Sequence, residues 1–238
     1  MKKILIDPGH GLYYDETQKK YIFQREQING VIEDVLTIYT ANKLIPKLSQ
    51  AGFDVLYTRD YTLNPRLSPT TKKPEYFDGA FLYLSEDLPK KISTDFTLDG
   101  LNITDNYKKD VNCRFIYANK INKTIPISLL LSIHYNAGVP AANGVETWYH
   151  NGNSNMKKLA TLLSNQTARI CGLKNRGANG EDQNYAALKI PDMNSLIWEV
   201  AFFTSVSDVF KIKQKDFYDK VTSAAVDVIS FADKNNII

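Results

Sequence analysis

The sequence lacks the marks of a disulfide scaffold and of a membrane protein. It has two cysteines in 238 residues, Cys113 and Cys171, and without CxxC spacing they predict free thiols. No run of about 18 apolar residues occurs, so we expect no membrane insertion. Within residues 1–6, a short apolar run follows two lysines, but Asp7 and Pro8 end this run too early for a signal peptide. We therefore expect a protein made soluble, which stays in the cytoplasm until it is released.

The sequence also lacks strong charge, internal repeats and linkers. Its net charge is +3, and no dense run of lysine or arginine indicates a nucleic-acid site. With 43% hydrophobic and 23% charged residues, the composition is that of a globular chain with a real core. The length predicts a single domain over residues 1–238.

Residues 60–110 differ from the rest, because they have no clear hydrophobic period, although residues 76–84 could form a small strand. They contain four prolines and scattered aromatic residues. A stretch of this length without pattern is usually a functional insertion or lid. Surface elaboration is the alternative, and the sequence leaves both open.

The motif LIDPGHG at residues 5–11 follows a predicted strand directly. Asp7, Pro8 and Gly9 break the strand, since proline removes a donor and glycine admits unusual backbone angles. His10 then stands at the carboxyl end of the strand, the edge at which open α/β sheets bind their ligands. A lone histidine there is more often a polar turn residue than a metal ligand.

A strand–helix–strand unit comes next. Apolar residues recur at helical spacing over residues 32–48, Gly52 marks the end, and residues 53–59 form the next strand. Short joins between these elements predict parallel strands and a right-handed crossover. Pro46 lies inside the helix, so we expect irregularity over residues 42–47.

A second apolar strand over residues 129–137 ends in His134 and Asn136. Two buried strands that each close on a histidine place two nitrogen ligands at one edge of one sheet. Two histidines and a carboxylate form a catalytic zinc set with one position left for water. A set of three histidines is less favoured, because His150 lies in turn sequence and reads as a surface residue.

Glu199 is the one charge in the hydrophobic stretch of residues 195–203. Burial of a polar group without a hydrogen bond costs about 2–7 kcal/mol, and burial of an unpaired charge such as a carboxylate costs more. Glu199 therefore needs a proton, a cation or a metal-bound water nearby, and a structural salt bridge is an equal alternative.

The remaining pattern predicts helices over residues 111–123, 154–170 and 216–234. Residues 144–149 read as a strand with Glu146 in its alternation. Arg176 and Gly177 open a loop, and residues 187–190 are short and strand-like.

The sequence resembles the zinc-dependent N-acetylmuramoyl-L-alanine amidases, a peptidoglycan amidase family. The resemblance covers nearly the whole chain except residues 60–110. Several blocks occur in the family's order: IDPGHG at 6–11, Glu33 with Ala41 and Leu44, TR at 58–59, Arg114 with Ala118 and Asn119, SIHYNA at 132–137, GVE at 144–146, RG at 176–177 and WEVAF at 198–202.

The resemblance implies one zinc ion, bound by His10, Glu33 and His134. Glu16 and Glu26 compete with Glu33, because the loop after the first histidine is longer here than in the family. We choose Glu33, since the apolar helix pattern that follows the family's ligand starts there.

By the same resemblance Glu199 is the catalytic glutamate. We also expect Asn136 and Arg176 to bind substrate, and orientation of His134 is the alternative role for Asn136. Trp198 departs from the family, which usually has a small aliphatic residue there, and we expect it to narrow the pocket. The implied fold is α/β: a twisted, mostly parallel sheet of about six strands with helices on both faces and an insertion after the second strand.

The implied reaction is zinc-dependent hydrolysis of the amide between N-acetylmuramic acid and L-alanine in peptidoglycan. We expect a monomeric phage or prophage lysin that acts on the cell wall, with a sporulation autolysin of the same chemistry as the alternative. The first rival is also a hydrolase, a zinc peptidase acting on stem peptides. The second is of a different class, a non-catalytic wall-binding module.

Overall fold

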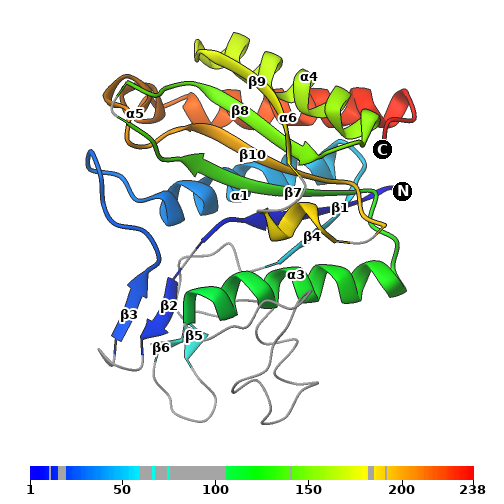
Figure 1. The fold of residues 1–238 in the computed structure, drawn as a ribbon, viewed down its shortest axis with the longest axis horizontal. Helices are drawn as coiled ribbons and strands as arrows, with labels where there is room; N and C mark the ends of the chain where they lie inside the picture. Colours follow the sequence, from blue (N-terminus) through cyan, green and yellow to red (C-terminus); the bar gives the residue numbers. More distant parts are fainter. Residues whose placement is uncertain are drawn as a thin grey trace.

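The computed structural model describes residues 1–10, 12–15, 20–58, 66–67, 74–75, 106–139, 141–181, 185–190 and 192–238. Their centre is a six-stranded sheet in the order β4-β1-β7-β10-β8-β9 (Figure 1). Its strands are β1 (Lys3–Pro8), β4 (Asp54–Tyr57), β7 (Leu129–Asn136), β8 (Val145–His150), β9 (Asn175–Glu181) and β10 (Ser195–Phe202).

The sheet is mostly parallel. β1 runs parallel to β4 and β7, β7 parallel to β10, and β8 parallel to β9, whereas β8 and β10 are antiparallel. Strands buried on both faces read as near-continuous apolar runs, as in β1, β7 and β10. The predicted fold class is confirmed.

Helices cover both faces of the sheet (Figure 1). One hydrophobic cluster joins the sheet to α1 (Glu33–Gln50), α4 (Ser154–Cys171) and α6 (Phe217–Lys234). A second cluster joins the other face to α3 (Asn106–Thr124) and the 3-10 helix η1 (Ala186–Leu188). The short helix α5 (Val206–Ile212) precedes α6.

Two small strand pairs lie outside the main sheet. β2 (Leu12–Asp15) pairs with β3 (Lys20–Phe23), and β5 (Arg66–Leu67) pairs with β6 (Pro74–Glu75). Most of residues 60–110, including the strand predicted at 76–84, lie outside the described residues. The single domain with an insertion stays a prediction, although α3 already begins at Asn106.

Two short segments differ from the sequence prediction. Arg176 and Gly177, predicted to open a loop, lie within β9. That strand is polar and forms through its pairing with β8 rather than through an apolar face. Residues 187–190, predicted as strand-like, contribute to η1 instead.

The predicted irregularity at Pro46 is wrong. α1 runs without interruption from Glu33 to Gln50 with Pro46 inside it. Proline removes the bond to the carbonyl four residues earlier, which here belongs to Asn42. Both residues are exposed, so water can satisfy that carbonyl and the helix continues.

The alternation of β10 separates its side chains between the two faces. Trp198 is 0% exposed and belongs to the cluster with α1, α4 and α6, whereas Ile197 packs in the cluster with α3. Successive strand residues point to opposite faces, so Glu199 shares the α3 face with Ile197. The expectation that Trp198 narrows the site is therefore wrong.

The two chain ends meet beside the start of β1. The Lys2 ammonium donates to the Ile238 carbonyl and lies 3.0 Å from Asp233 Oδ1, and Figure 1 shows both ends on the same side. Among the described helices, none combines the length and apolar content that a bilayer crossing requires.

Candidate metal centre

His10 lies in a fixed turn just after β1. The Gly9 amide donates to the Ile133 carbonyl at 2.8 Å, and the Thr37 hydroxyl donates to the Gly9 carbonyl at 2.7 Å. His10 itself has a φ of 58°, a left-handed conformation that is uncommon outside glycine and that clusters at functional sites. The backbone, rather than a free loop, therefore sets the direction of this imidazole.

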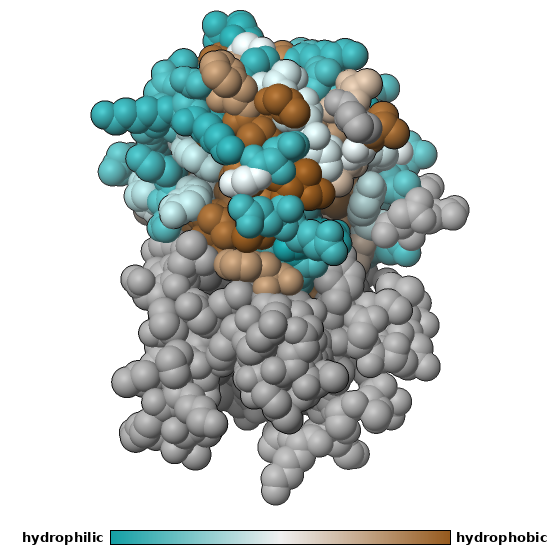
Figure 2. Space-filling model, turned by 90° about the vertical axis from the view of Figure 1, so that its left-hand side faces the viewer, coloured by the Kyte–Doolittle hydropathy of each residue, from teal (hydrophilic) through white to brown (hydrophobic). Residues whose placement is uncertain are grey.

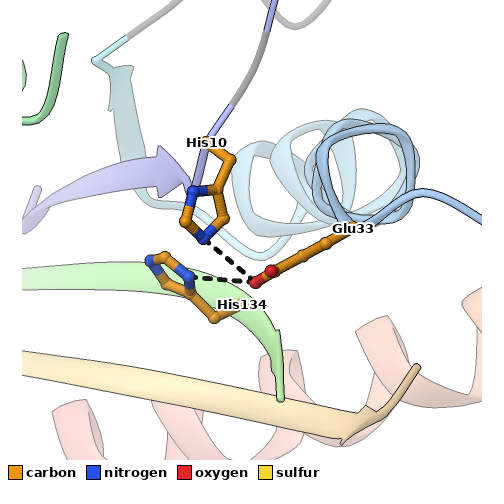
Figure 3. Close-up of side chains that lie close together, drawn as sticks. All are labelled: His10, Glu33 and His134. Carbon is orange, nitrogen blue, oxygen red and sulfur yellow. Dashed lines mark hydrogen bonds and ion pairs between the residues drawn. The ribbon is translucent and has the colours of Figure 1, made fainter. Parts of the chain in front are cut away.

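His10, Glu33 and His134 converge on one point (Figure 3). Glu33 Oε1 lies 3.3 Å from His10 Nε2 and 3.2 Å from His134 Nδ1. Two ligands about 2.0–2.1 Å from a tetrahedral zinc ion are about 3.3 Å apart. Glu33 is the first residue of α1, β1 leads to His10, and β7 carries His134, so three elements of the main fold build the cluster.

Neighbouring groups hold each of the three side chains. Gln24 Oε1 lies 3.3 Å from His10 Nδ1, and the Tyr135 amide donates to Glu33 Oε1 at 3.1 Å. A Cβ on Gly9 would lie 2.3 Å from His134 Cε1 and 2.4 Å from Nε2. Because Gly9 has no side chain, the His134 ring can lie against the turn that follows β1.

The electrostatics keep His10 neutral and Glu33 charged. Burial lowers the pKa of His10 to about 4, despite the hydrogen bond to Glu33. Burial acts to raise the pKa of Glu33, but the hydrogen bonds and charges of the two histidines hold that pKa well below 4.5. Burial acts to lower the pKa of His134, but Glu33 and Glu199 raise that pKa above 6.5. Metal ions bind neutral imidazoles and ionised carboxylates, so His10 and Glu33 are in the forms that bind a metal ion.

Glu199 lies on the same row of the sheet. It pairs with His134 of β7 on one side and with Glu146 of β8 on the other. Its Oε2 atom is buried and has no hydrogen-bond partner among the described residues. Burial is the largest cause that raises the pKa of Glu199 to about 8, and His134 opposes it. A buried carboxylate oxygen without a hydrogen-bond partner is typical of a site that binds a ligand, an ion or a proton.

The alternative ligands that the structure describes, Glu26 and His150, lie outside the cluster. Glu26 is exposed, and His150 is the exposed last residue of β8. Glu16 lies outside the described residues. The structure brings the chosen set together, and the role of that set as metal ligands stays a prediction.

Asn136 and Arg176, predicted to bind substrate, meet at a third residue. Asn136 Nδ2 donates to Glu146 Oε1 at 2.7 Å, and Arg176 Nε donates to Glu146 Oε2 at 2.6 Å. Sequence reasoning missed this role of Glu146. The signal was the one used for Glu199: a carboxylate in an otherwise apolar strand needs a partner.

The polar support beneath His10 was also missed. Asp7 is fully buried, accepts from the Thr58 hydroxyl at 2.5 Å and the Ser132 hydroxyl at 2.6 Å, and lies 2.9 Å from Arg114 Nε. Arg114 Nη1 also donates to the His10 carbonyl at 3.4 Å. Asp7 therefore ties together β1, β7 and α3 three residues before the histidine.

The candidate centre lies at the side of the molecule at which β1, β7 and β10 end. Figure 2 shows this side, on which hydrophobic and hydrophilic residues are interspersed. It is the edge at which α/β sheets place their ligands, as the two strand-end histidines predicted.

Comparisons with known proteins point to one family. The family model for N-acetylmuramoyl-L-alanine amidase matches residues 4–230. The amidase LytC of Bacillus subtilis (strain 168) is 30% identical over 146 residues, which are 59% of this chain and 29% of LytC. This chain thus spans less than a third of that relative's length.

Two solved structures share the fold. An N-acetylmuramoyl-L-alanine amidase from Clostridium difficile 630 is 22% identical, with a TM-score of 0.65 over 98% of this chain and 97% of that chain. The CwlD amidase from Clostridioides difficile, solved with the GerS lipoprotein, is 17% identical, with a TM-score of 0.68 over 98% and 99%. The family match over most of the length, together with the site described above, shows that this chain belongs to the N-acetylmuramoyl-L-alanine amidase family.

Proposed function

We propose that this chain is a zinc-dependent amidase that cleaves the bond between N-acetylmuramic acid and L-alanine in peptidoglycan. The single observation that carries the proposal is the convergence of His10, Glu33 and His134 beside Glu199, whose buried Oε2 has no hydrogen-bond partner within the part of the chain that the structure describes. Family membership supplies the substrate class, and the geometry supplies the means of hydrolysis.

The residues present fit a zinc ion. Two imidazole nitrogens and one carboxylate oxygen are a donor set of catalytic zinc sites, which keep a position open for water or substrate. The distances from Glu33 Oε1 to the two histidine nitrogens, 3.3 and 3.2 Å, suit ligands of a single ion. When bound, zinc would polarise the amide carbonyl and acidify a water molecule.

Glu199 would move the protons of the reaction. Its ionised form is favoured beside a cation, so the carboxylate can accept a proton from the attacking water. It can then donate that proton to the alanine nitrogen as the carbon–nitrogen bond of the lactyl amide breaks. One buried carboxylate thereby serves first as base and then as acid. His10 and His134, held from β1 and β7, fix the place at which this occurs.

Digestion of purified peptidoglycan tests the proposal. The products are identified by mass spectrometry, with and without a chelator. We expect free stem peptides that begin with alanine, lost on chelation and restored by zinc. Shortened stem peptides still attached to muramic acid would favour the peptidase rival. Absence of release under every metal condition would favour the wall-binding rival.

A phage lysin and a sporulation autolysin would both use this reaction. The setting we propose is that of a lysin acting on the cell wall, as expected above. Expression in a bacterial host together with a membrane-permeabilising protein tests it, since a lysin should then clear the culture and a Glu199→Gln variant should not.

A further inference from the structure

Arg176 occupies an irregular position in β9. Val145 pairs with Asn175 and Glu146 pairs with Gly177, so Arg176 is an extra residue between two consecutive pairs. Gly177 has a φ of 86°, which glycine adopts at little cost. Such bulges redirect a side chain and are over-represented beside active sites.

Two contacts hold the redirected side chain, and a third holds its partner Glu146. Arg176 Nε donates to Glu146 Oε2 at 2.6 Å, and Asn136 fixes the other oxygen of Glu146 at 2.7 Å. The Arg176 guanidinium carbon lies 4.9 Å from the centre of the Phe202 ring, within the range of a cation–π contact. The guanidinium is therefore held in place from one edge and one face.

The other edge of this guanidinium is available. Arginine has five N–H donors, and Nη1 and Nη2 of Arg176 have no hydrogen-bond partner among the residues that the structure describes. The side chain is 33% exposed, whereas its partner Glu146 is 6% exposed. A held guanidinium with a free outer edge matches a carboxylate, which it can bind through two parallel bonds.

Arg176 lies in line with the candidate centre. His134, Glu199, Glu146 and Gly177 pair across the neighbouring strands β7, β10, β8 and β9. Neighbouring strands are about 4.8 Å apart, so β9 lies about 10 Å from the strand of Glu199. An extended peptide covers about 7 Å in two residues and about 10 Å in three.

We propose that Arg176 is a specificity-determining residue that binds a free carboxylate of the peptidoglycan stem peptide, two or three residues beyond the cleaved amide. The inference rests on the proposed function. Two carboxylates have the right chemistry and reach: the α-carboxylate of a D-glutamate at position two, and the side-chain carboxylate of a diaminopimelate at position three. Amidation of either removes its charge and one acceptor oxygen.

Kinetics on matched muramyl peptides test the inference. The substrates carry free carboxylates at both positions, an amide at position two, or an amide at position three. The wild type should cleave the free form with at least about tenfold higher kcat/KM than one of the amidated forms, because a charge-assisted bond is lost. The amidated position with the loss identifies the carboxylate.

The variant Arg176→Gln should abolish this preference, mainly through a higher KM for the free form. Arg169→Gln is the matched control, since Arg169 is exposed and bonds only to Gln166 among the described residues. A purely structural role of Arg176 would lower kcat on all three substrates and leave their ratio unchanged. That result, or a wild type without preference, would overturn the inference.

Calorimetric titration with the free tripeptide L-alanyl-γ-D-glutamyl-diaminopimelate gives a readout that needs no turnover. Arg176→Gln should weaken binding at least about tenfold, and Arg169→Gln should not change it. Equal binding by Arg176→Gln and wild type would contradict the inference alone. Failure of the zinc-loaded protein to cleave any muramyl peptide, with Arg176-dependent tripeptide binding intact, would overturn the proposed reaction and leave the carboxylate site standing.

Discussion

At the scale of single residues, Glu199 lies next to the histidine cluster, and its buried Oε2 atom has no hydrogen-bond partner in the described ranges of the chain. The change Glu199→Gln keeps the size of this side chain and removes its ability to carry a proton. We expect kcat to fall by about 10²–10⁴-fold, with zinc content unchanged because His10, Glu33 and His134 remain. Kinetics on a muramyl peptide and metal analysis of the same preparation check this.

Glu26→Gln is the matched control for that experiment, because Glu26 is an exposed glutamate of the same region. It should leave both activity and zinc content unchanged. Full activity in Glu199→Gln would remove Glu199 from the mechanism, and zinc loss in Glu26→Gln would reopen the identity of the carboxylate ligand.

The buried carboxylate of Asp7 should contribute strongly to the free energy of unfolding. Asp7→Asn leaves Arg114 charged and buried at 1% exposure, so the free energy of unfolding should fall by about 3–5 kcal/mol. Urea unfolding measures the change. Asp227→Asn, at an exposed position, is the control and should lie within about 0.5 kcal/mol of wild type.

The same residue predicts a pH dependence. Burial acts to raise the pKa of Asp7, but Arg114, Ser132 and Thr58 hold it below 3.8. A depressed pKa adds stability above the unfolded-state pKa, and this stability is lost as the pH falls through the folded-state pKa. In chelated protein, the stability difference between wild type and Asp7→Asn should therefore narrow below about pH 4. A difference that stays constant down to about pH 2 would contradict this.

The residues that sequence alone could find are those whose chemistry is visible in one stretch. His10 and His134 each end an apolar strand, and Glu199 interrupts one. Glu146 was not assigned a role, because its partners Asn136 and Arg176 come from two other strands. Only the pairing of strands far apart in the chain brings such groups together.

At the scale of elements, the turn after β1 depends on the absence of a side chain at Gly9. In Gly9→Ala the new methyl group would meet the His134 ring at 2.3–2.7 Å and displace it from Glu33. Changes in groups that orient metal ligands typically cost about 10–100-fold in metal affinity, and we expect a loss of that size in a competitive zinc titration.

Gly180→Ala is the control for the turn. Its methyl group would meet Oδ1 of Asn151 at 2.8 Å, and that flexible side chain can move aside. Zinc affinity should stay at the wild-type value. Wild-type affinity in Gly9→Ala would show that the ring tolerates the displacement and that the turn does not set its position.

α1 carries a second testable feature in its exposed Pro46. The proline costs the helix one hydrogen bond, which Pro46→Ala restores between residues 46 and 42. The helix is stabilised by up to about 3 kcal/mol. Removal of the proline also gives the unfolded chain more conformational freedom, which offsets about 0.4–1 kcal/mol of this gain. We expect a net stabilisation of about 1–2 kcal/mol in urea unfolding, and destabilisation would contradict the account given for Pro46.

The elements themselves were predictable to different degrees. The buried strands β1, β7 and β10 and the helices α1, α4 and α6 have strong apolar patterns and were found. β9 was missed because its sequence, NRGANGE, has no apolar face. α5 is too short for a clear period, at 7 residues.

At the scale of the whole molecule, zinc should stabilise the fold. The cluster joins β1, α1 and β7, so an ion bound there favours the folded chain. Zinc at about 100 times its dissociation constant adds about 2.7 kcal/mol, which corresponds to a rise in Tm of about 5–10 °C for a chain of this size. Thermal unfolding with and without zinc measures it.

The histidines provide matched variants for this measurement. His10→Ala should abolish the zinc-dependent rise in Tm, because a ligand is lost. His150→Ala, at the exposed end of β8, should keep the rise in full. A rise that persists in His10→Ala would place the ion elsewhere.

The meeting of the chain ends has a consequence for protein engineering. Lys2 contacts the last turn at Asp233 and Ile238, at the edge where β1 starts, whereas the candidate centre lies at the edge where β1 ends. Neighbouring termini favour circular permutation. A short peptide could thus link residue 238 to residue 1, with new ends opened in an exposed turn such as residues 151–152. Immobilisation of this chain through residue 1 or residue 238 would leave the edge with the candidate centre facing outward.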